Sequence, residues 1–160
     1  TFKIPEPYIP KVGAKVMSLA DPTKKMSKSD ENPNGFISIL DKPEVIIKKF
    51  KRAVTDCDSQ VCYKEGKDGI NNLMTIYSVV TGYSNEQIER EFAGKGYGDF
   101  KQKVGEAVAE HLRPVRDNFE KISADKAYLE QCYKSGAEKA SMFSQRTLDK
   151  VYKKVGFIAL

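Results

Sequence analysis

Apolar residues recur at three- and four-residue intervals through most of the chain that follows Asp41. This spacing places them along one face of an α-helix, whereas a half-buried strand requires apolar residues at every second position. The pattern predicts a mostly α-helical chain with four or five helices. The predicted helical segments are 41–54, 68–82, 84–94, 100–122 and 123–155.

Local sequence also indicates where several of these helices begin and end. Asp41 lies three residues before a glutamate, which is the spacing of a capping box, and Pro43 suits a first helical turn. Ser84 and Gln87 have the same capping-box spacing. Gly82 is expected to end the helix before them, because glycine adopts the left-handed conformation found after helix C-termini.

Two short apolar runs before residue 41 have the composition of strands. They cover residues 14–19 and 36–40. One or two strands cannot form a stable sheet alone. We therefore expect residues 1–40 to be a small α/β piece whose strands pair with a sheet outside this chain, and residues 41–160 to be helical.

Composition limits the classes of function that fit this chain. Its 160 residues carry 27 basic and 22 acidic side chains, and the net charge of +5 is compatible with an anionic partner without requiring one. The three cysteines are Cys57, Cys62 and Cys132, and their odd number and spacing argue against a disulfide framework or a zinc site. We expect reduced thiols, a cytoplasmic location and no metal ligands. No apolar run approaches the about 18 residues of a membrane span.

The segment DPTKKMSKSDENPNG, residues 21–35, concentrates positive charge in a stretch that suits neither a helix nor a strand. Lys25 and Lys28 are three residues apart, so a tight turn can bring both ammonium groups to one ligand. Ser27 and Ser29 add neutral donors, and a diphosphate or triphosphate is the natural ligand of such a set. On charge alone, a solvated basic loop is the alternative interpretation.

The order of these residues carries a resemblance to a known family. Residues 25–29, KMSKS, are identical to the signature of class I aminoacyl-tRNA synthetases. Further segments resemble bacterial-type tryptophanyl-tRNA synthetases, from near residue 5 to near residue 158. These segments are GAKVMSLADPTKKMSKSDENPNG, KKFKRAVTDCD, GINNLMTIYSVVTG, FAGKGYGDFK and GAEKAS.

The resemblance implies the substrates and the nucleotide-binding residues. Members of this family activate tryptophan with ATP and Mg²⁺ and transfer it to tRNA(Trp). Lys25 and Lys28 match the motif lysines that contact the ATP phosphates, and they are the implied catalytic residues. The backbone of Val16 is expected to contact adenine, and Asp30 is expected to form a hydrogen bond within the loop. The implied nucleotide-binding residues are Val16, Lys25, Met26, Ser27, Lys28 and Ser29.

The resemblance also implies a domain organisation and a tRNA surface. Residues 1–40 match the end of a Rossmann-type catalytic domain with its KMSKS loop, and residues 41–160 match the helical domain that binds the tRNA anticodon. Basic side chains on the first helix are candidates for tRNA contact, although any one of them can be merely solvated. Exposed tyrosines are candidates for stacking on bases. The basic candidates are Lys48, Lys51 and Arg52, and the tyrosines are Tyr63, Tyr83 and Tyr97.

The family's first signature, His-x-Gly-His, and its tryptophan pocket are not found in these residues, and the single histidine is His111. We therefore expect the chain alone to be inactive. The family works as a homodimer with contacts largely in the other half, so this chain can be monomeric. A tyrosyl-tRNA synthetase fragment and a non-catalytic tRNA-binding helical module remain alternatives.

Overall fold

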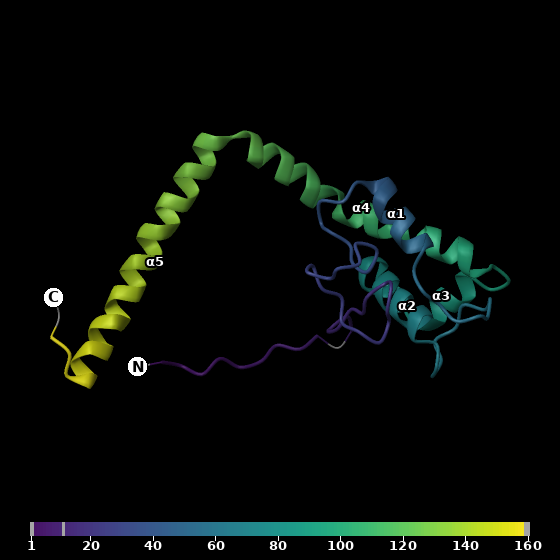
Figure 1. Cartoon of the computed structure of the whole chain (residues 1–160), viewed down its shortest axis with the longest axis horizontal. Coiled ribbons are helices and arrows are strands. Elements are labelled where there is room, and N and C mark those ends of the chain that lie inside the picture. The colour runs from purple at the N-terminus through teal and green to yellow at the C-terminus, as the bar shows by residue number, and fades with distance from the viewer. Residues whose placement is uncertain (1, 11, 159–160) are drawn as a thin grey trace. The chain divides into compact units, whose positions relative to one another are not determined.

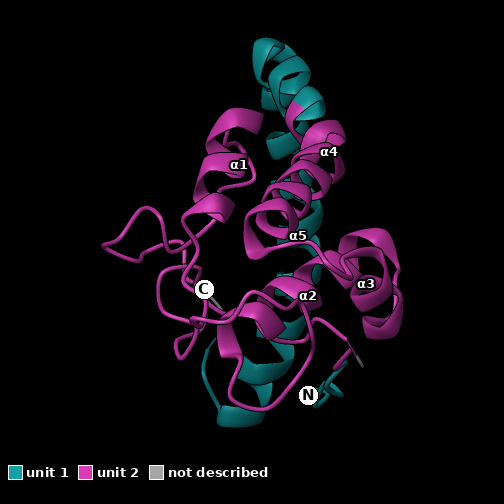
Figure 2. Cartoon of the chain, turned by 90° about the vertical axis from the view of Figure 1, so that its right-hand side faces the viewer, with its two compact units in different colours: residues 1–8, 117–160 teal, residues 9–116 magenta. Residues whose placement is uncertain are grey.

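The computed structural model describes residues 2–10 and 12–158, and it is mostly helical as predicted (Figure 1). Its helices are α1 (Pro43–Lys51), α2 (Asp68–Thr81), α3 (Asn85–Glu91), α4 (Tyr97–Ala124) and α5 (Lys126–Val155). The chain divides into two compact units, residues 9–116 and residues 1–8 with 117–160 (Figure 2). The predicted domain division after residue 40 stays a prediction.

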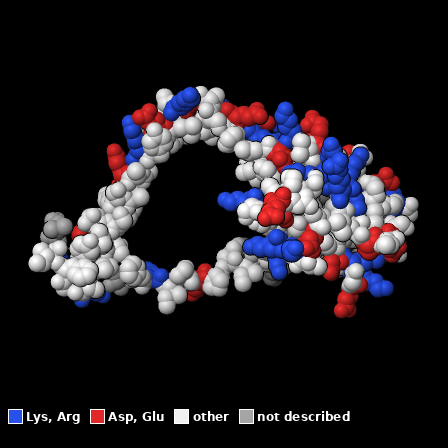
Figure 3. All heavy atoms as spheres, in the orientation of Figure 1, with Lys and Arg blue, Asp and Glu red and all other residues white. Residues whose placement is uncertain are grey.

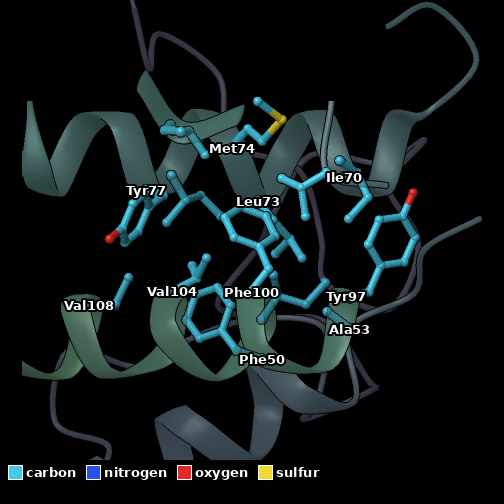
Figure 4. Close-up of a cluster of buried hydrophobic side chains, with 14 of the residues drawn as sticks. Phe50, Ala53, Ile70, Leu73, Met74, Tyr77, Tyr97, Phe100, Val104 and Val108 are labelled. Atoms are coloured by element: carbon cyan, nitrogen blue, oxygen red, sulfur yellow. The ribbon is translucent and has the colours of Figure 1, made fainter. Parts of the chain in front are cut away.

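The unit formed by residues 9–116 is built around one hydrophobic core. Phe50 of α1, Leu73 of α2 and Phe100 of α4 are almost fully buried in it (Figure 4). Burial of one such side chain contributes roughly 1.5–3 kcal/mol. Gly105 lets α4 approach α1 closely, since a Cβ atom there would lie 2.9 Å from the Cα atom of Ile47. The amphipathic spacing of the sequence therefore predicts most of the buried positions in this unit, although Val54 and Val115 of the predicted apolar faces are exposed.

Local sequence predicts most of these helix boundaries correctly, including the place of Pro43 in the first turn of α1. Gly82 ends α2 with a φ of 78°, as expected. Ser84 caps α3 through a capping box: its Oγ accepts from the Gln87 N–H at 3.4 Å, and its own N–H donates to Gln87 Oε1 at 2.8 Å. The capping box predicted at Asp41 is wrong, because α1 begins after Lys42 without a side-chain cap.

Asp41 instead pairs with a lysine that sequence periodicity places on the solvent side. Lys49 is only 9% exposed, and its Nζ lies 2.7 Å from Asp41 Oδ2. The same ammonium donates to the carbonyl oxygen of Phe36 at 3.0 Å. Burial of a lysine is tolerated here because the charge is paired and hydrogen-bonded. Lys49 therefore attaches the segment before α1 to the helix and is unavailable to a ligand.

The strands predicted over residues 14–19 and 36–40 do not form in the described part of the chain. A single antiparallel bridge joins Met17 to Lys25. A strand needs a neighbouring strand for its backbone groups, and these residues have none to extend the ladder. The Rossmann-type sheet therefore remains an expectation from the resemblance.

Helix α5 belongs to the other unit, and none of its described residues is buried. Its predicted apolar stripe is present in the sequence, but Leu129, Tyr133 and Leu148 are all exposed. A left-handed Gly156, with a φ of 79°, follows its last turn. Among the described residues, no helix combines the length and apolarity that crossing a membrane requires.

Candidate functional site

The lysine–serine loop, residues 21–35, is anchored at its base by the bridge between Met17 and Lys25. Its far end is anchored too, since the N–H of Leu19 donates to the carbonyl of Gly35 at 2.9 Å. These bonds bring the two ends of the loop to one short stretch of backbone. Two backbone hydrogen bonds form this bridge, from Ser18 N to Lys24 O (2.8 Å) and from Met26 N to Val16 O (3.0 Å).

The first turn of the loop is held by Asp21. Its carboxylate accepts from the Thr23 hydroxyl at 2.6 Å and lies 3.0 Å from Lys24 Nζ. These hydrogen bonds, that of Thr23 first, lower the pKa of Asp21 to about 2. Lys24 is therefore engaged within the loop, although it lies next to the signature.

Unlike Lys24, the two signature lysines are not engaged by an acidic side chain of the loop. Lys25 and Lys28 are exposed, and neither forms an ion pair with any residue that the structure describes. Met26 between them is half-buried against the hydrophobic core and so attaches the signature to the fold. Two uncompensated ammonium groups on an anchored turn suit a polyphosphate, which brings its own negative charge.

The serines of the signature lie together. Ser27 Oγ and Ser29 Oγ are 3.0 Å apart, and the N–H of Ser29 donates to Ser27 Oγ at 3.3 Å. Both side chains are exposed. Each hydroxyl can rotate to donate to an acceptor outside the loop. The structure thus brings the predicted lysines and serines into one exposed turn.

The exit of the loop depends on Asp30 and Gly35. Asp30 Oδ1 accepts from the N–H of Asn32 at 2.9 Å, which confirms the predicted hydrogen bond within the loop. A Cβ atom on Gly35 would lie 2.7 Å from Asp30 Oδ2 and 2.9 Å from the hydroxyl of Ser18. Only glycine fits between these atoms without displacing them, so the loop can close on itself at this point.

The predicted basic face lies at the end of α1. Lys48, Lys51 and Arg52 are exposed and form no ion pair with other described residues. Figure 3 shows lysine and arginine side chains gathered over α1. Basic residues in a last helical turn also interact favourably with the helix dipole, which is a purely structural explanation of their position. Their role in tRNA binding stays a prediction.

The prediction that Tyr97 stacks on a base is wrong. Tyr63 and Tyr83 are exposed, but Tyr97 is 9% exposed. Its hydroxyl donates to Asp56 Oδ1 at 2.8 Å. Burial, followed by this contact with Asp56, raises the pKa of Tyr97 to about 12. Tyr97 therefore packs and hydrogen-bonds within the fold and presents no open face to a base.

Sequence reasoning missed the polar network to which Tyr97 belongs. Lys67 Nζ lies 2.6 Å from Asp58 Oδ2 and 3.1 Å from the hydroxyl of Tyr97. The hydrogen bond to Asp58 is the main reason that the pKa of Lys67 is raised. Burial raises the pKa of Asp56, but hydrogen bonds, led by that of Tyr97, lower it overall. The network connects residues 56–58 to the starts of α2 and α4.

No cluster of three His, Cys, Asp or Glu side chains in the described ranges could hold a metal ion. The exposed ammonium groups of Lys25 and Lys28 suit an anion. Residues 1–113 match the sequence model of the family described as tRNA synthetases class I (W and Y). The chain belongs to this family. The matched range includes the whole lysine–serine loop and helices α1 to α3.

Comparison with curated proteins shows which members of the family are similar in sequence to this chain. The chain is 51% identical over 158 residues to the tryptophan–tRNA ligase of Wolinella succinogenes, and 50% identical over 158 residues to that of Clostridium perfringens. Each match covers 99% of this chain and 48% of the relative. The chain thus spans about half the length of the curated relatives it matches.

Solved structures agree with the fold. A tryptophanyl-tRNA synthetase from Mycoplasma pneumoniae superposes with a TM-score of 0.78 at 29% identity, over 91% of this chain and 46% of that one. A tryptophanyl-tRNA synthetase from Campylobacter jejuni, complexed with ADP and tryptophan, superposes with a TM-score of 0.67 over 89% of this chain and 44% of that one. Because the sequence identity of this second match is 24%, it shows a similar fold and nothing further.

Proposed function

We propose that this chain is the C-terminal part of a tryptophan–tRNA ligase, which joins tryptophan to tRNA(Trp) at the expense of ATP. The observation that carries the proposal is the anchored turn with Lys25 and Lys28 exposed and unpaired among the described residues. About half of the residues are identical to those of curated tryptophan–tRNA ligases over nearly the whole chain. This similarity favours tryptophan over tyrosine as the amino-acid substrate.

In the proposed reaction the tryptophan carboxylate attacks the α-phosphorus of ATP. The bond to pyrophosphate breaks, and its electron pair leaves on the pyrophosphate oxygen. Lys25 and Lys28 stabilise the negative charge that develops there, because their ammonium groups are already positioned before the reaction. Ser27 and Ser29 donate hydrogen bonds to phosphate oxygens. The chain thereby supplies electrostatic stabilisation of the leaving group.

The base of the loop is proposed to hold the rest of the nucleotide. The backbone of Val16 would contact adenine, and the backbone of Met26 would lie close to the nucleotide. Both side chains are half-buried against the core, so their backbone is well anchored. Mg²⁺ is proposed to enter with the ATP phosphates, where it would neutralise part of their charge.

Residues 41–160 are proposed to form the part that binds the tRNA anticodon. The exposed basic residues at the end of α1 support this role. We also propose that the complete ligase is a homodimer with most of its contacts outside this chain. A cytoplasmic location is proposed on the family's role and on the three free cysteines.

Tryptophan-dependent ATP–pyrophosphate exchange tests the proposed function. We expect exchange by the protein extended with the residues encoded upstream of Thr1, and no exchange above background by the 160-residue chain alone. Substituting tyrosine for tryptophan in the assay is expected to abolish exchange. An extended protein that binds tRNA without exchanging pyrophosphate would instead indicate a non-catalytic tRNA-binding module.

Charge reversal at the end of α1 tests the proposed tRNA surface. Lys51→Glu combined with Arg52→Glu is expected to weaken binding of tRNA(Trp) to the complete ligase about tenfold at ~0.1 M salt. The slope of log affinity against log salt should fall by about 2, because two phosphate contacts are lost. Filter binding across a salt series measures both quantities.

The matched control makes the same change in net charge on another helix. Lys126→Glu combined with Lys139→Glu alters two exposed lysines of α5 that, like Lys51 and Arg52, form no ion pair with other described residues. If both double variants weakened binding equally, the effect would come from net charge alone, and the residues at the end of α1 would be removed from the proposed surface.

A further inference from the structure

A buried asparagine of α2 contacts the backbone at the base of the lysine–serine loop. Asn72 is only 6% exposed. Its Oδ1 accepts from the N–H of Met17 at 2.9 Å, and its Nδ2 donates to the carbonyl of Met17 at 2.9 Å. One side chain thus satisfies both backbone groups of a residue 55 positions earlier in the chain.

The pattern of backbone hydrogen bonds explains why Met17 needs such a partner. The bonds that define the bridge between Met17 and Lys25 are made by the residues on either side of them. In an antiparallel pair of this kind, the N–H and C=O of the bridged residue point away from its partner strand. A further strand would normally pair with them. Here the carboxamide of Asn72 occupies the place of that strand.

The contact of Asn72 with Met17 also restrains the signature lysine Lys25, through the backbone bridge between Met17 and Lys25. Asn72 holds Met17, and Met17 is paired with Lys25. Helix α2 is itself fixed in the core by neighbouring residues such as Leu73. The position of the loop is therefore set by the helical core and does not depend only on the short backbone bridge.

Resting on the proposed function, we infer that Asn72 is a positioning residue for adenylate formation. Its carboxamide fixes the backbone of Met17, and through it the placement of Lys25 relative to the nucleotide. Both polar groups of its carboxamide are engaged by the backbone of Met17, so its assigned role is to position the loop. Its loss would act on the geometry of the transition state, since small displacements of a charged group have large effects on rate.

The adjacent residue provides a matched control. Asn71 Oδ1 accepts from the N–H of Lys64 at 3.1 Å, and its Nδ2 donates to the carbonyl of Lys64 at 2.7 Å. The two asparagines therefore make the same pair of backbone hydrogen bonds from the same helix. They differ in which segment they hold, because Lys64 lies outside the lysine–serine loop. Asn72 is also buried, whereas Asn71 is half-buried.

The experiment compares Asn72→Leu with Asn71→Leu in the complete ligase, at a temperature where circular dichroism shows both to be folded. Asn72→Leu is expected to lower kcat for tryptophan-dependent pyrophosphate exchange about 10- to 100-fold, with the KM for tryptophan changed less than about threefold. Asn71→Leu should retain kcat within about threefold. Amide hydrogen exchange at Met26 should accelerate in Asn72→Leu only.

Asn72→Asp keeps the acceptor for the Met17 N–H and removes the donor, and it replaces Asn72→Leu if the latter does not fold. A kcat for the Asn72 variant equal to that of Asn71→Leu would overturn the inference, as would unchanged hydrogen exchange at Met26. An inactive parent protein would instead refute the proposed function, and the hydrogen-exchange comparison would still decide whether Asn72 positions the loop.

Discussion

Replacing Lys25 with glutamine in the complete ligase is expected to lower kcat for tryptophan-dependent pyrophosphate exchange by about 100- to 1,000-fold, and replacing Lys28 should do the same. Both ammonium groups are exposed and without an ion pair among the described residues, so their charge is available to the pyrophosphate. Glutamine keeps a hydrogen-bond donor but removes the charge. The loss should therefore fall on the transition state, where the negative charge develops.

Lys24→Gln is the control for this pair. Lys24 is adjacent to the signature and also exposed, but its ammonium lies 3.0 Å from Asp21. Its removal changes the net charge equally and is expected to alter kcat less than about fivefold, since an exposed ion pair contributes little. Steady-state exchange rates for the three variants decide the matter. Normal rates in Lys25→Gln and Lys28→Gln would refute the assignment of this loop.

Gly69→Ala is expected to lower the free energy of unfolding of the chain by about 3 kcal/mol. A Cβ atom at this position would collide with the carbonyl oxygen of Val54 and lie 3.0 Å from the Cα atom of Thr55. Both are backbone atoms, which cannot move aside by a change of rotamer. The first turn of α2 would therefore have to separate from the segment that follows α1. Urea unfolding followed by circular dichroism measures the change.

Gly98→Ala provides the comparison. Gly98 is the second residue of α4, as Gly69 is the second residue of α2, but a Cβ atom on Gly98 would meet nothing within 4 Å. Alanine has the higher helix propensity, so this variant should be unchanged or stabilised by up to about 1 kcal/mol. Equal destabilisation by both substitutions would show that close packing against Val54 is not the cause.

The helices and the exposed turn that carries the signature could be predicted from the sequence. Helix α3 begins where Ser84 and Gln87 place it, and α2 ends at Gly82. Capping and periodicity depend on residues three or four apart, so a short window of sequence contains all the information they need. The signature is likewise continuous, so its lysines and serines could be named without knowing the fold.

The roles of Lys49, Tyr97 and Asn72 could not be predicted in this way. Spacing places Lys49 among solvated lysines, whereas it is buried against Asp41. Tyr97 is expected to be open to bases, whereas it binds Asp56. Each of these contacts joins residues whose separation along the chain carries no periodic pattern. Burial and pairing arise when the helices pack, so propensity has no bearing on them.

Local spacing in this chain is therefore enough to predict its helices and to place an exposed lysine–serine turn before the first of them. It is not enough to say how that turn is held. The missing sheet partner of Met17 is replaced by a side chain from α2, 55 residues away. The Asn72 side chain takes this place because a half-buried backbone group must find a hydrogen-bond partner. Which partner is available depends on which helix packs against that backbone.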